Sequence, residues 1–159
     1  MWRLASGPAS VNARHDPMPE IFELTPNDAT AQAASDISRL MTLLAGAPRS
    51  ITQTDLRIVT ESNHLFAAWH EGAIIGVVGL VPMRLPQGVR LWIESVILDP
   101  DHRGGGYGRA LMEAALVKAR SYGDVPVSLT SNPTRSVAHR LFERLGFVRA
   151  ETSVFRRSA

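Results

Sequence analysis

The sequence predicts an α+β fold, and three observations carry that prediction. Runs rich in β-branched residues alternate with runs whose apolar residues recur every three or four positions. Glu71-Gly72 separates two β-type runs as a tight hairpin turn would. No internal repeat, low-complexity tract or linker divides the sequence. We therefore expect one domain over residues 20–159, preceded by a flexible tail over residues 1–19.

The N-terminal half is predicted to hold a strand, two helices and a hairpin. Residues 21–26 form a short strand that ends at a proline, and a helix follows with Asn27 or Asp28 as its cap and Gly46 near its end. A second, shorter helix covers residues 52–62, and the hairpin covers residues 64–82. The apolar stripe of the first helix is Ala33, Ile37, Leu40, Met41 and Leu44.

The C-terminal half begins with a predicted loop over residues 83–88. A long strand rich in β-branched and aromatic residues follows over residues 89–100 and ends at a proline. The next helix covers residues 107–122, and a largely apolar strand covers residues 125–131.

The last helix is predicted to begin at Asn132-Pro133, because proline suits the first helical position, and to end at Gly146. Residues 147–157 then close the fold as one strand or a bent hairpin. The apolar stripe of this helix is Ala138, Leu141, Phe142 and Leu145.

Composition excludes several classes of function. The 159 residues are 45% hydrophobic and 20% charged, with a formal net charge of +2, so nothing demands a nucleic acid or an anionic membrane as partner. The absence of cysteine removes disulfides, thiolate zinc sites and thiol nucleophiles, and it fits a cytoplasmic location. The most apolar run, residues 73–81, is far shorter than the ~20 residues of a membrane-spanning helix.

Other sites are also not expected. His64 and His70 bracket a strand without the spacing of a metal site, so no metal is predicted, and no G-x-S-x-G nucleophile motif occurs. The arginines near the C-terminus alternate with acids and apolar residues, which predicts a solvated face rather than a nucleic-acid surface: Arg140, Arg144, Arg149, Arg156 and Arg157.

A glycine-rich run precedes the helix over residues 107–122. Its glycines are Gly104, Gly105, Gly106 and Gly108. A helix start exposes unpaired backbone N–H groups with partial positive charge, and glycines let an anion approach them closely. A strand, a glycine-rich turn and a helix are therefore the parts of a phosphate-binding site.

The spacing of the glycines distinguishes between the known phosphate-binding motifs. A nucleotide P-loop needs a lysine after its last glycine, and a dinucleotide fingerprint needs glycine where Arg109 or Leu111 stands. The run from Arg103 to Gly108 instead resembles the [Q/R]-x-x-G-x-[G/A] motif of the GCN5-related N-acetyltransferases, the GNAT family. The preceding strand, the following helix and residues 138–147 match that family in order, over residues 21–157 in all.

This resemblance implies an α/β/α layered fold. Its central sheet would be mixed and mostly antiparallel, with six to seven strands and about four helices, and residues 20–159 would form a single N-acetyltransferase domain. Splayed central strands, residues 89–100 and 125–131, would form the cleft for acetyl-CoA, the acetyl donor. A homodimer is implied by the resemblance alone.

The resemblance also implies roles for individual residues. The backbone N–H of Val96 would hold the oxyanion, while the main chains of Val96, Ile97 and Leu98 would bind the pantetheine arm. Arg103 and Arg109 would meet the phosphates, or they are simply solvated. Tyr107 would pack on or cover the loop. The cradle for the pyrophosphate would be Arg103, Gly104, Gly105, Gly106, Tyr107, Gly108 and Arg109.

Glu94 lies within the long strand, where an ionised carboxylate is costly unless it is paired or wetted. Two roles are open: a base that acts on the amine through water, as the resemblance implies, or an ion pair with Arg84 or Arg90 on a solvated face. The two-residue period of a strand predicts that Trp92, Glu94 and Val96 share one face.

Two positions depart from the family pattern. Phe142 stands where many relatives carry a tyrosine that protonates the departing thiolate, so this chain either dispenses with the acid or binds its cofactor without efficient turnover. The usual asparagine is also displaced, because Arg135 occupies its place and Asn132 stands three residues earlier. Asn132 would bond the pantetheine or cap the last helix.

The expected activity is direct transfer of the acetyl group to a primary amine in a ternary complex, since no cysteine can carry it. A small-molecule amine is favoured slightly over a protein amine, and the first two helices with residues 83–88 would shape its pocket. The alternative is a non-catalytic acyl-CoA-binding regulatory module.

Overall fold

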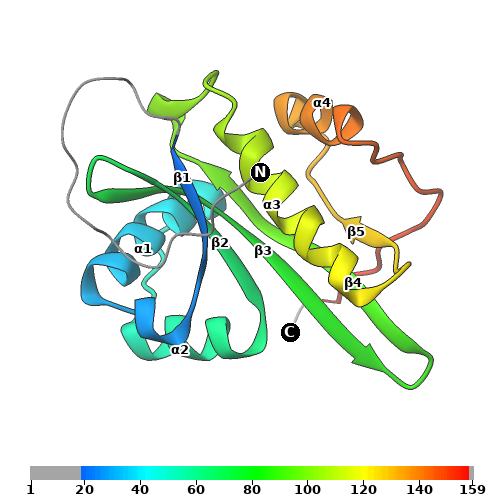
Figure 1. Cartoon of the computed structure of the whole chain (residues 1–159). Coiled ribbons are helices and arrows are strands. Elements are labelled where there is room, and N and C mark those ends of the chain that lie inside the picture. The colour runs from blue at the N-terminus through cyan, green and yellow to red at the C-terminus, as the bar shows by residue number, and fades with distance from the viewer. Residues whose placement is uncertain (1–18, 158–159) are drawn as a thin grey trace.

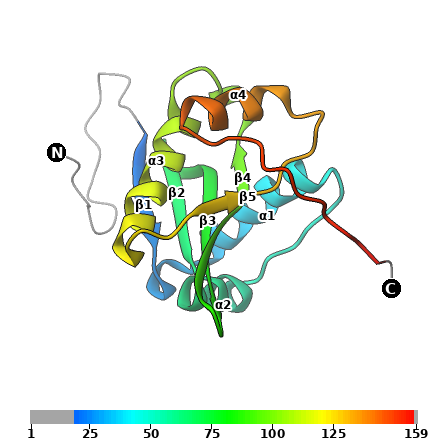
Figure 2. The ribbon, with the colours of Figure 1, turned by 90° about the vertical axis from the view of Figure 1, so that its right-hand side faces the viewer.

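The computed structural model describes residues 19–157, which form one five-stranded mixed sheet with helices on both faces (Figures 1 and 2). The strand order is β1-β2-β3-β4-β5; the first four strands are antiparallel neighbours, and β5 runs parallel to β4. The strands are β1 (Glu20–Leu24), β2 (His64–His70), β3 (Ala73–Leu85), β4 (Gly88–Leu98) and β5 (Val127–Leu129).

Four α-helices cover the sheet, as predicted. Helices α1 and α2 share one apolar core with the sheet, and α3 and α4 share a second core on the opposite face. The helices are α1 (Ala31–Ala45), α2 (Gln53–Ser62), α3 (Tyr107–Ala119) and α4 (Ser136–Arg144), with short 3-10 turns η1 (Pro26–Asp28), η2 (Pro100–His102) and η3 (Arg120–Tyr122).

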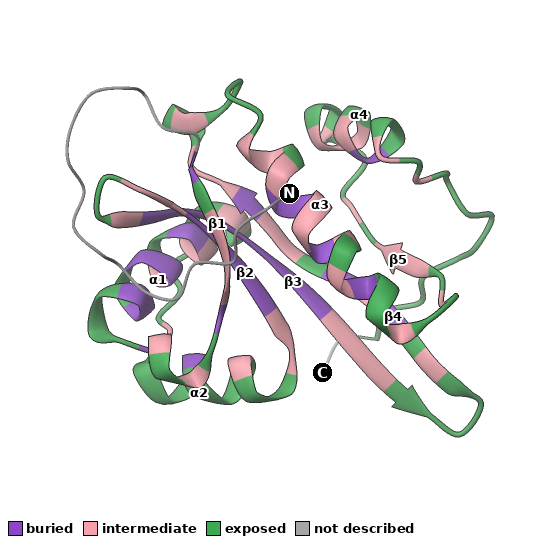
Figure 3. Ribbon diagram, in the orientation of Figure 1, coloured by how far each residue is buried: buried purple, intermediate pink, exposed green. Residues whose placement is uncertain are grey.

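The central strand β3 separates the two cores. Its Val77 packs with the α1 side, whereas its Val78 and Leu80 pack with the α3 side, and all three are fully buried. Figure 3 shows the buried stretch of β3 in purple. This burial explains the long apolar run in the sequence, because a strand covered on both faces needs apolar residues at successive positions.

Helix α1 begins later than the sequence indicates. The predicted cap at Asn27-Asp28 is wrong, because both residues belong to η1, where the Asp28 carboxylate accepts from the N–H of Thr25 at 2.7 Å. The cap is Thr30, whose hydroxyl accepts from the N–H of Ala33 at 3.1 Å. The predicted end is confirmed, since Gly46 adopts the left-handed conformation with φ of 67°.

The regions predicted as a loop and as a helix start differ from the structure. Residues 83–88 are not a loop, because β3 continues to Leu85 and β4 starts at Gly88. The last helix starts at Ser136 rather than at Asn132-Pro133, because the Asn132 side chain and main chain form a turn with Thr134 and Arg135 first.

The sheet has five strands rather than six to seven in the part of the chain that is described. Residues 147–157 form no strand, so β5 is an edge of the sheet. β5 is only three residues long, so it has few backbone groups with which a further strand could form hydrogen bonds. The apolar residues Val148, Val154 and Phe155 remain exposed. The tail predicted over residues 1–19 falls almost wholly outside the described residues, as does the end of the chain after residue 157.

Between residues 19 and 157, no helix combines the length and the apolar character that a membrane span requires.

Candidate active site

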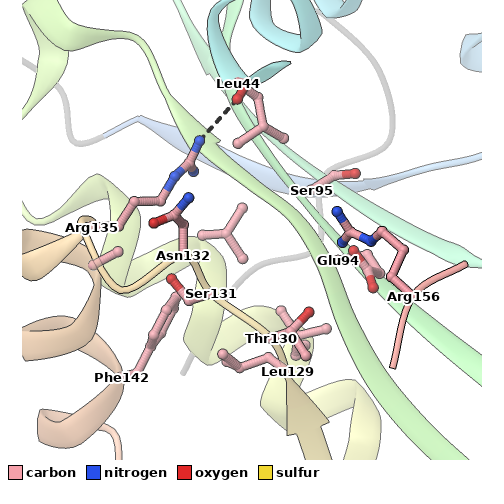
Figure 4. Close-up of a pocket in the computed structure, with 13 residues that line it drawn as sticks. Leu44, Glu94, Ser95, Leu129, Thr130, Ser131, Asn132, Arg135, Phe142 and Arg156 are labelled. Atoms are coloured by element: carbon pink, nitrogen blue, oxygen red, sulfur yellow. Dashed lines mark hydrogen bonds between the residues drawn. The ribbon is translucent and has the colours of Figure 1, made fainter. Parts of the chain in front are cut away.

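The site lies where β4 and β5 part. The two strands are paired only at Leu91–Val127, Trp92–Ser128 and Ile93–Leu129. Beyond Ile93, a cavity of about 440 Å³ opens between β4 and the segment that follows β5 (Figure 4). The cleft predicted between these two strands is therefore present in the fold.

A bulge in β4 shapes the wall of this cavity. Val77 pairs with Ile97 and Gly79 pairs with Glu94, so β4 has one more residue than β3 in this interval. Ser95 absorbs the extra residue with a φ of +55°, a left-handed conformation that is rare for serine.

The bulge changes which side chains share a face. Ile93 and Val96 both belong to the core beneath α3 and α4, which leaves Glu94 on the opposite face from Val96. The prediction that Trp92, Glu94 and Val96 share one face is therefore wrong at Val96, because the two-residue period assumes a strand without a bulge.

The cavity brings together residues from both layers and from the C-terminal segment. Four of the predicted site residues line it, namely Glu94, Val96, Asn132 and Phe142. The other lining residues are not among those predicted for the site: Leu44, Ile93, Ser95, Leu129, Thr130, Ser131, Arg135, Ala138 and Arg156. Of the elements predicted to shape the acceptor pocket, only α1 contributes, through Leu44.

Glu94 is exposed to solvent in the cavity. It forms no salt bridge with any of residues 19–157, so the predicted alternative of an ion pair with Arg84 or Arg90 is not present. A free, wetted carboxylate can accept a proton from a bound amine or from an intervening water.

No tyrosine lines the cavity. Phe142 occupies its α4 wall, is 7% exposed, and packs edge-on against Phe147 with ring centroids 6.1 Å apart. The hydroxyl of Tyr122 lies elsewhere, 2.6 Å from Nε2 of His64. Phe142 has no proton to donate. Among residues 19–157, no tyrosine lines the cavity that could protonate the departing thiolate.

The segment after β5 is held by its own polar side chains. The Oδ1 of Asn132 accepts from the N–H of Thr134 at 3.0 Å and from its hydroxyl at 2.9 Å, so Asn132 is the start of a turn and not the cap of α4. Ser131 lies 3.1 Å from Nε2 of His139. Arg135 reaches across the cavity, where its Nη2 donates to the carbonyl of Leu44 at 2.9 Å.

The glycine-rich run forms the turn that starts α3. Gly104 and Gly106 have φ of 90° and 82°, and a Cβ atom at either position would meet no atom within 4 Å, so the backbone faces open space there. No N–H from Gly104 to Arg109 donates to residues 19–157. Unpaired donors at a helix start, beside the open space at Gly104 and Gly106, fit the phosphates of acetyl-CoA.

The other predicted cradle residues lie in the same turn but outside the cavity. Arg103 is exposed and free of salt bridges within residues 19–157, whereas the Nε of Arg109 donates to Glu113 at 2.7 Å. The ring of Tyr107 lies against Gly105. Ile97 and Leu98 continue β4 toward this turn and do not line the cavity.

A metal site is not formed by the described part of the chain, which has no group of three or more histidine, aspartate and glutamate side chains that could hold an ion.

Comparison with known proteins places this geometry in a family. A model described as the acetyltransferase (GNAT) family matches residues 32–147. A Bacillus subtilis protein described as an uncharacterized N-acetyltransferase, YhdJ, is 31% identical over 137 residues, which are 85% of this chain and 95% of the relative.

Solved structures agree. An acetyltransferase from Trypanosoma brucei has a TM-score of 0.70 at 25% identity, over 88% of this chain and 99% of the other. An aminoglycoside acetyltransferase from a soil metagenomic sample superposes with a TM-score of 0.77 at 16% identity, over 89% and 96% of the two chains, and so shows the fold alone. The split sheet, the glycine turn at the start of α3 and these matches together show that the chain belongs to the GNAT family of N-acetyltransferases.

Proposed function

We propose that the protein transfers the acetyl group of acetyl-CoA directly to a primary amine, with a small-molecule amine as the favoured acceptor. The observation that carries this proposal is the cavity at the parting of β4 and β5, which Glu94 and Val96 both line from opposite faces of the strand at the bulge of Ser95. Membership of an acyltransferase family favours this enzyme over the non-catalytic acyl-CoA-binding module.

Acetyl-CoA would be held at two places. The unpaired N–H groups from Gly104 to Arg109 would bind the pyrophosphate, with Arg103 free to add its charge. Arg109 would have to leave Glu113, to which it is bound at an exposed position. The pantetheine would run along the main chain of Val96, Ile97 and Leu98 toward Asn132 and Phe142 on the opposite wall.

Acetyl transfer requires three events: loss of a proton from the ammonium group, attack on the thioester and departure of the thiolate. An alkylammonium with a pKa near ~10.4 must lose a proton, which Glu94 would accept through water, since its carboxylate is exposed and unpaired. The amine nitrogen then bonds to the thioester carbonyl carbon, whose oxygen the N–H of Val96 would stabilise. The C–S bond breaks last, CoA leaves as a thiolate, and the amide nitrogen gives up its remaining excess proton to water or to that thiolate.

Departure of the thiolate would need no acid. A thiol with a pKa near ~8.5 gives a tolerable leaving group at neutral pH, so the phenylalanine at position 142 is compatible with turnover. With no cysteine in the chain to carry the acetyl group, both substrates would be bound together.

Calorimetric titration with acetyl-CoA tests the proposal, with Gly106→Glu as the variant and Gly106→Asn as its control. Asparagine tolerates the left-handed conformation at Gly106 and is neutral, so it separates charge from backbone strain. We expect micromolar binding, on the order of −8 kcal/mol, to the unmodified protein. It should weaken at least about 100-fold with glutamate, from charge repulsion at the turn.

Retained binding in Gly106→Glu would contradict the phosphate site, and no binding to the unmodified protein would contradict the proposed function. Three further expectations stay predictions: one N-acetyltransferase domain over residues 20–159, a cytoplasmic location, which the absence of cysteine fits, and a homodimer, which rests on the resemblance alone.

A further inference from the structure

We propose that the acceptor amine carries an anionic group next to the amine, as an α-amino acid does, and that Arg156 and Arg135 bind that group. This inference rests on the proposed function and names the substrate class of the same cavity.

The first step is the balance of charge in the cavity. Among the described residues that line it, Glu94 is the only acid, whereas Arg135 and Arg156 are both cations. A site for a polyamine would need several carboxylates, since each ammonium group must be matched when it loses water. The excess of positive charge instead fits an acceptor that brings its own negative charge.

Arg135 is a fixed cation. Its side chain is half-buried, and one of its five N–H donors is spent on the carbonyl of Leu44 at 2.9 Å. It forms no salt bridge with any acid between residues 19 and 157. A half-buried guanidinium without a carboxylate partner is partly desolvated and uncompensated, so an anion that entered the cavity would gain by binding it.

Arg156 is a free cation on the same side of the cavity as Glu94. Figure 4 shows its guanidinium extending toward Glu94, and both residues line the cavity. The two side chains form no salt bridge, since no guanidinium nitrogen of Arg156 lies within 4.0 Å of a carboxylate oxygen of Glu94. A carboxylate and a guanidinium that are close but unpaired match a ligand with an amine and an anion a few bonds apart.

The apolar residues of the cavity wall indicate which part of the cavity would hold the pantetheine and which part is left for the acceptor. Val96, Leu129, Ala138 and Phe142 all belong to the core beneath α3 and α4, the face on which the glycine turn lies. This wall suits the uncharged pantetheine and thioester. Leu44 belongs to the α1 layer, and Glu94 faces away from the α3 side, so the charged residues are left for the acceptor.

The combination predicts a zwitterionic acceptor. Its amine would lie against Glu94, which takes the proton, and its carboxylate would bind Arg156 with support from Arg135. A protein lysine has no carboxylate beside its amine and would not use these arginines. The inference therefore also separates small-molecule acceptors from protein acceptors.

The test is steady-state CoA release with matched pairs of acceptors, each an L-amino acid and its amide, across amino acids of different size. The amide has the less basic amine and therefore more free amine at neutral pH, so intrinsic reactivity favours the amide. A preference for the free acid would consequently come from the protein. We expect that preference in at least one pair.

Arg156→Gln is the informative variant, and Arg157→Gln is its matched control, because Arg157 is the next residue and does not line the cavity. We expect Arg156→Gln to raise KM for the preferred amino acid about 10- to 100-fold, the loss of one charge-assisted hydrogen bond, and to leave its amide unchanged. Arg157→Gln should change neither. Acetyl-CoA titration should give the same affinity for all three proteins.

Equal rates with acids and amides, or equal effects of the two variants, would overturn the anionic acceptor and leave N-acetyl transfer standing. Failure of acetyl-CoA to bind would overturn the proposed function and this inference together.

Discussion

The two sides of β4 differ in almost every respect. Toward β3, the strand is paired from Leu98–Gly76 to Gly88–Leu85, and β3 itself is buried from Ile74 to Leu80. Toward β5, it is paired only from Leu91–Val127 to Ile93–Leu129, and β5 itself is half-buried at most. The paired side is the source of stability, whereas the parted side leaves room and unpaired polar groups for ligands.

Polar groups on the two sides of β4 also differ in whether they have bonding partners within the protein. On the paired side, the buried carboxylate of Asp36 accepts from the N–H of Ile74 and from the amide of Gln32, each at 3.0 Å. On the parted side, Glu94, Arg135 and Arg156 have no ionic partner within residues 19–157. Satisfied groups hold a fold, and unsatisfied groups at an open cavity are available to bind substrates.

The largest expected effect is on activity alone, from Glu94→Gln. We expect kcat to fall about 10²- to 10⁴-fold, because the amine loses its base, and the loss to shrink as pH rises toward the pKa of the amine itself. The unfolding midpoint should not change, since Glu94 is exposed and unpaired. Glu143→Gln, an exposed carboxylate on α4 outside the cavity, is the control. A loss that is independent of pH would contradict the base.

The next effect is on stability alone. Leu80→Ala on the paired side should lower the free energy of unfolding by about 2–5 kcal/mol, because Leu80 is fully buried and its truncation leaves a void. Leu129→Ala on β5 should cost about 1 kcal/mol, because Leu129 is half-buried beside an existing cavity. Urea unfolding measures both. Equal losses of unfolding free energy in the two variants would contradict the conclusion that the side of β4 toward β3 contributes more stability than the side toward β5.

A smaller effect is expected at Asp36. Asp36→Ala leaves the N–H of the buried Ile74 without its acceptor and should destabilise the protein by about 1–3 kcal/mol. Asp36→Asn keeps an oxygen at that place and should cost less. If the two variants unfolded at the same urea concentration, the hydrogen bond to Ile74 would contribute nothing measurable.

The smallest effect is a pH dependence at Asp99, directly after β4. Burial opposes ionisation of Asp99, but the N–H of Asp101 and the guanidinium of Arg39 outweigh burial and hold its pKa below the ordinary value. The folded state therefore binds this proton less tightly than the unfolded chain. The stabilisation is present above the ordinary aspartate pKa and is lost as pH falls through the lowered one.

Asp99→Asn should accordingly cost up to about 1 kcal/mol at neutral pH, since Arg39 is partly exposed, and nothing in strong acid. Unfolding in urea at about pH 7 and about pH 2 compares the two conditions. A difference between variant and unmodified protein that persisted in acid would contradict the ionic contribution.

The sequence by itself determined what depends on neighbours along the chain. The hairpin at Glu71-Gly72 is confirmed, with φ of 46° and 86° at the two residues, and so is the end of α1 at Gly46. The start of α3 directly after the glycines is confirmed as well. Turn chemistry and helix boundaries of this kind are fixed by conformational preferences of a few consecutive residues.

Only the tertiary structure decided the content of the site. The bulge at Ser95 depends on which residues of β3 lie opposite, and it places Glu94 and Val96 on different faces. Arg135 and Arg156 enter the cavity because the segments after β5 and α4 turn toward α1 and β4. Local preference carries no information about such approaches, since strand register and side-chain encounters are set by packing between residues far apart in the chain.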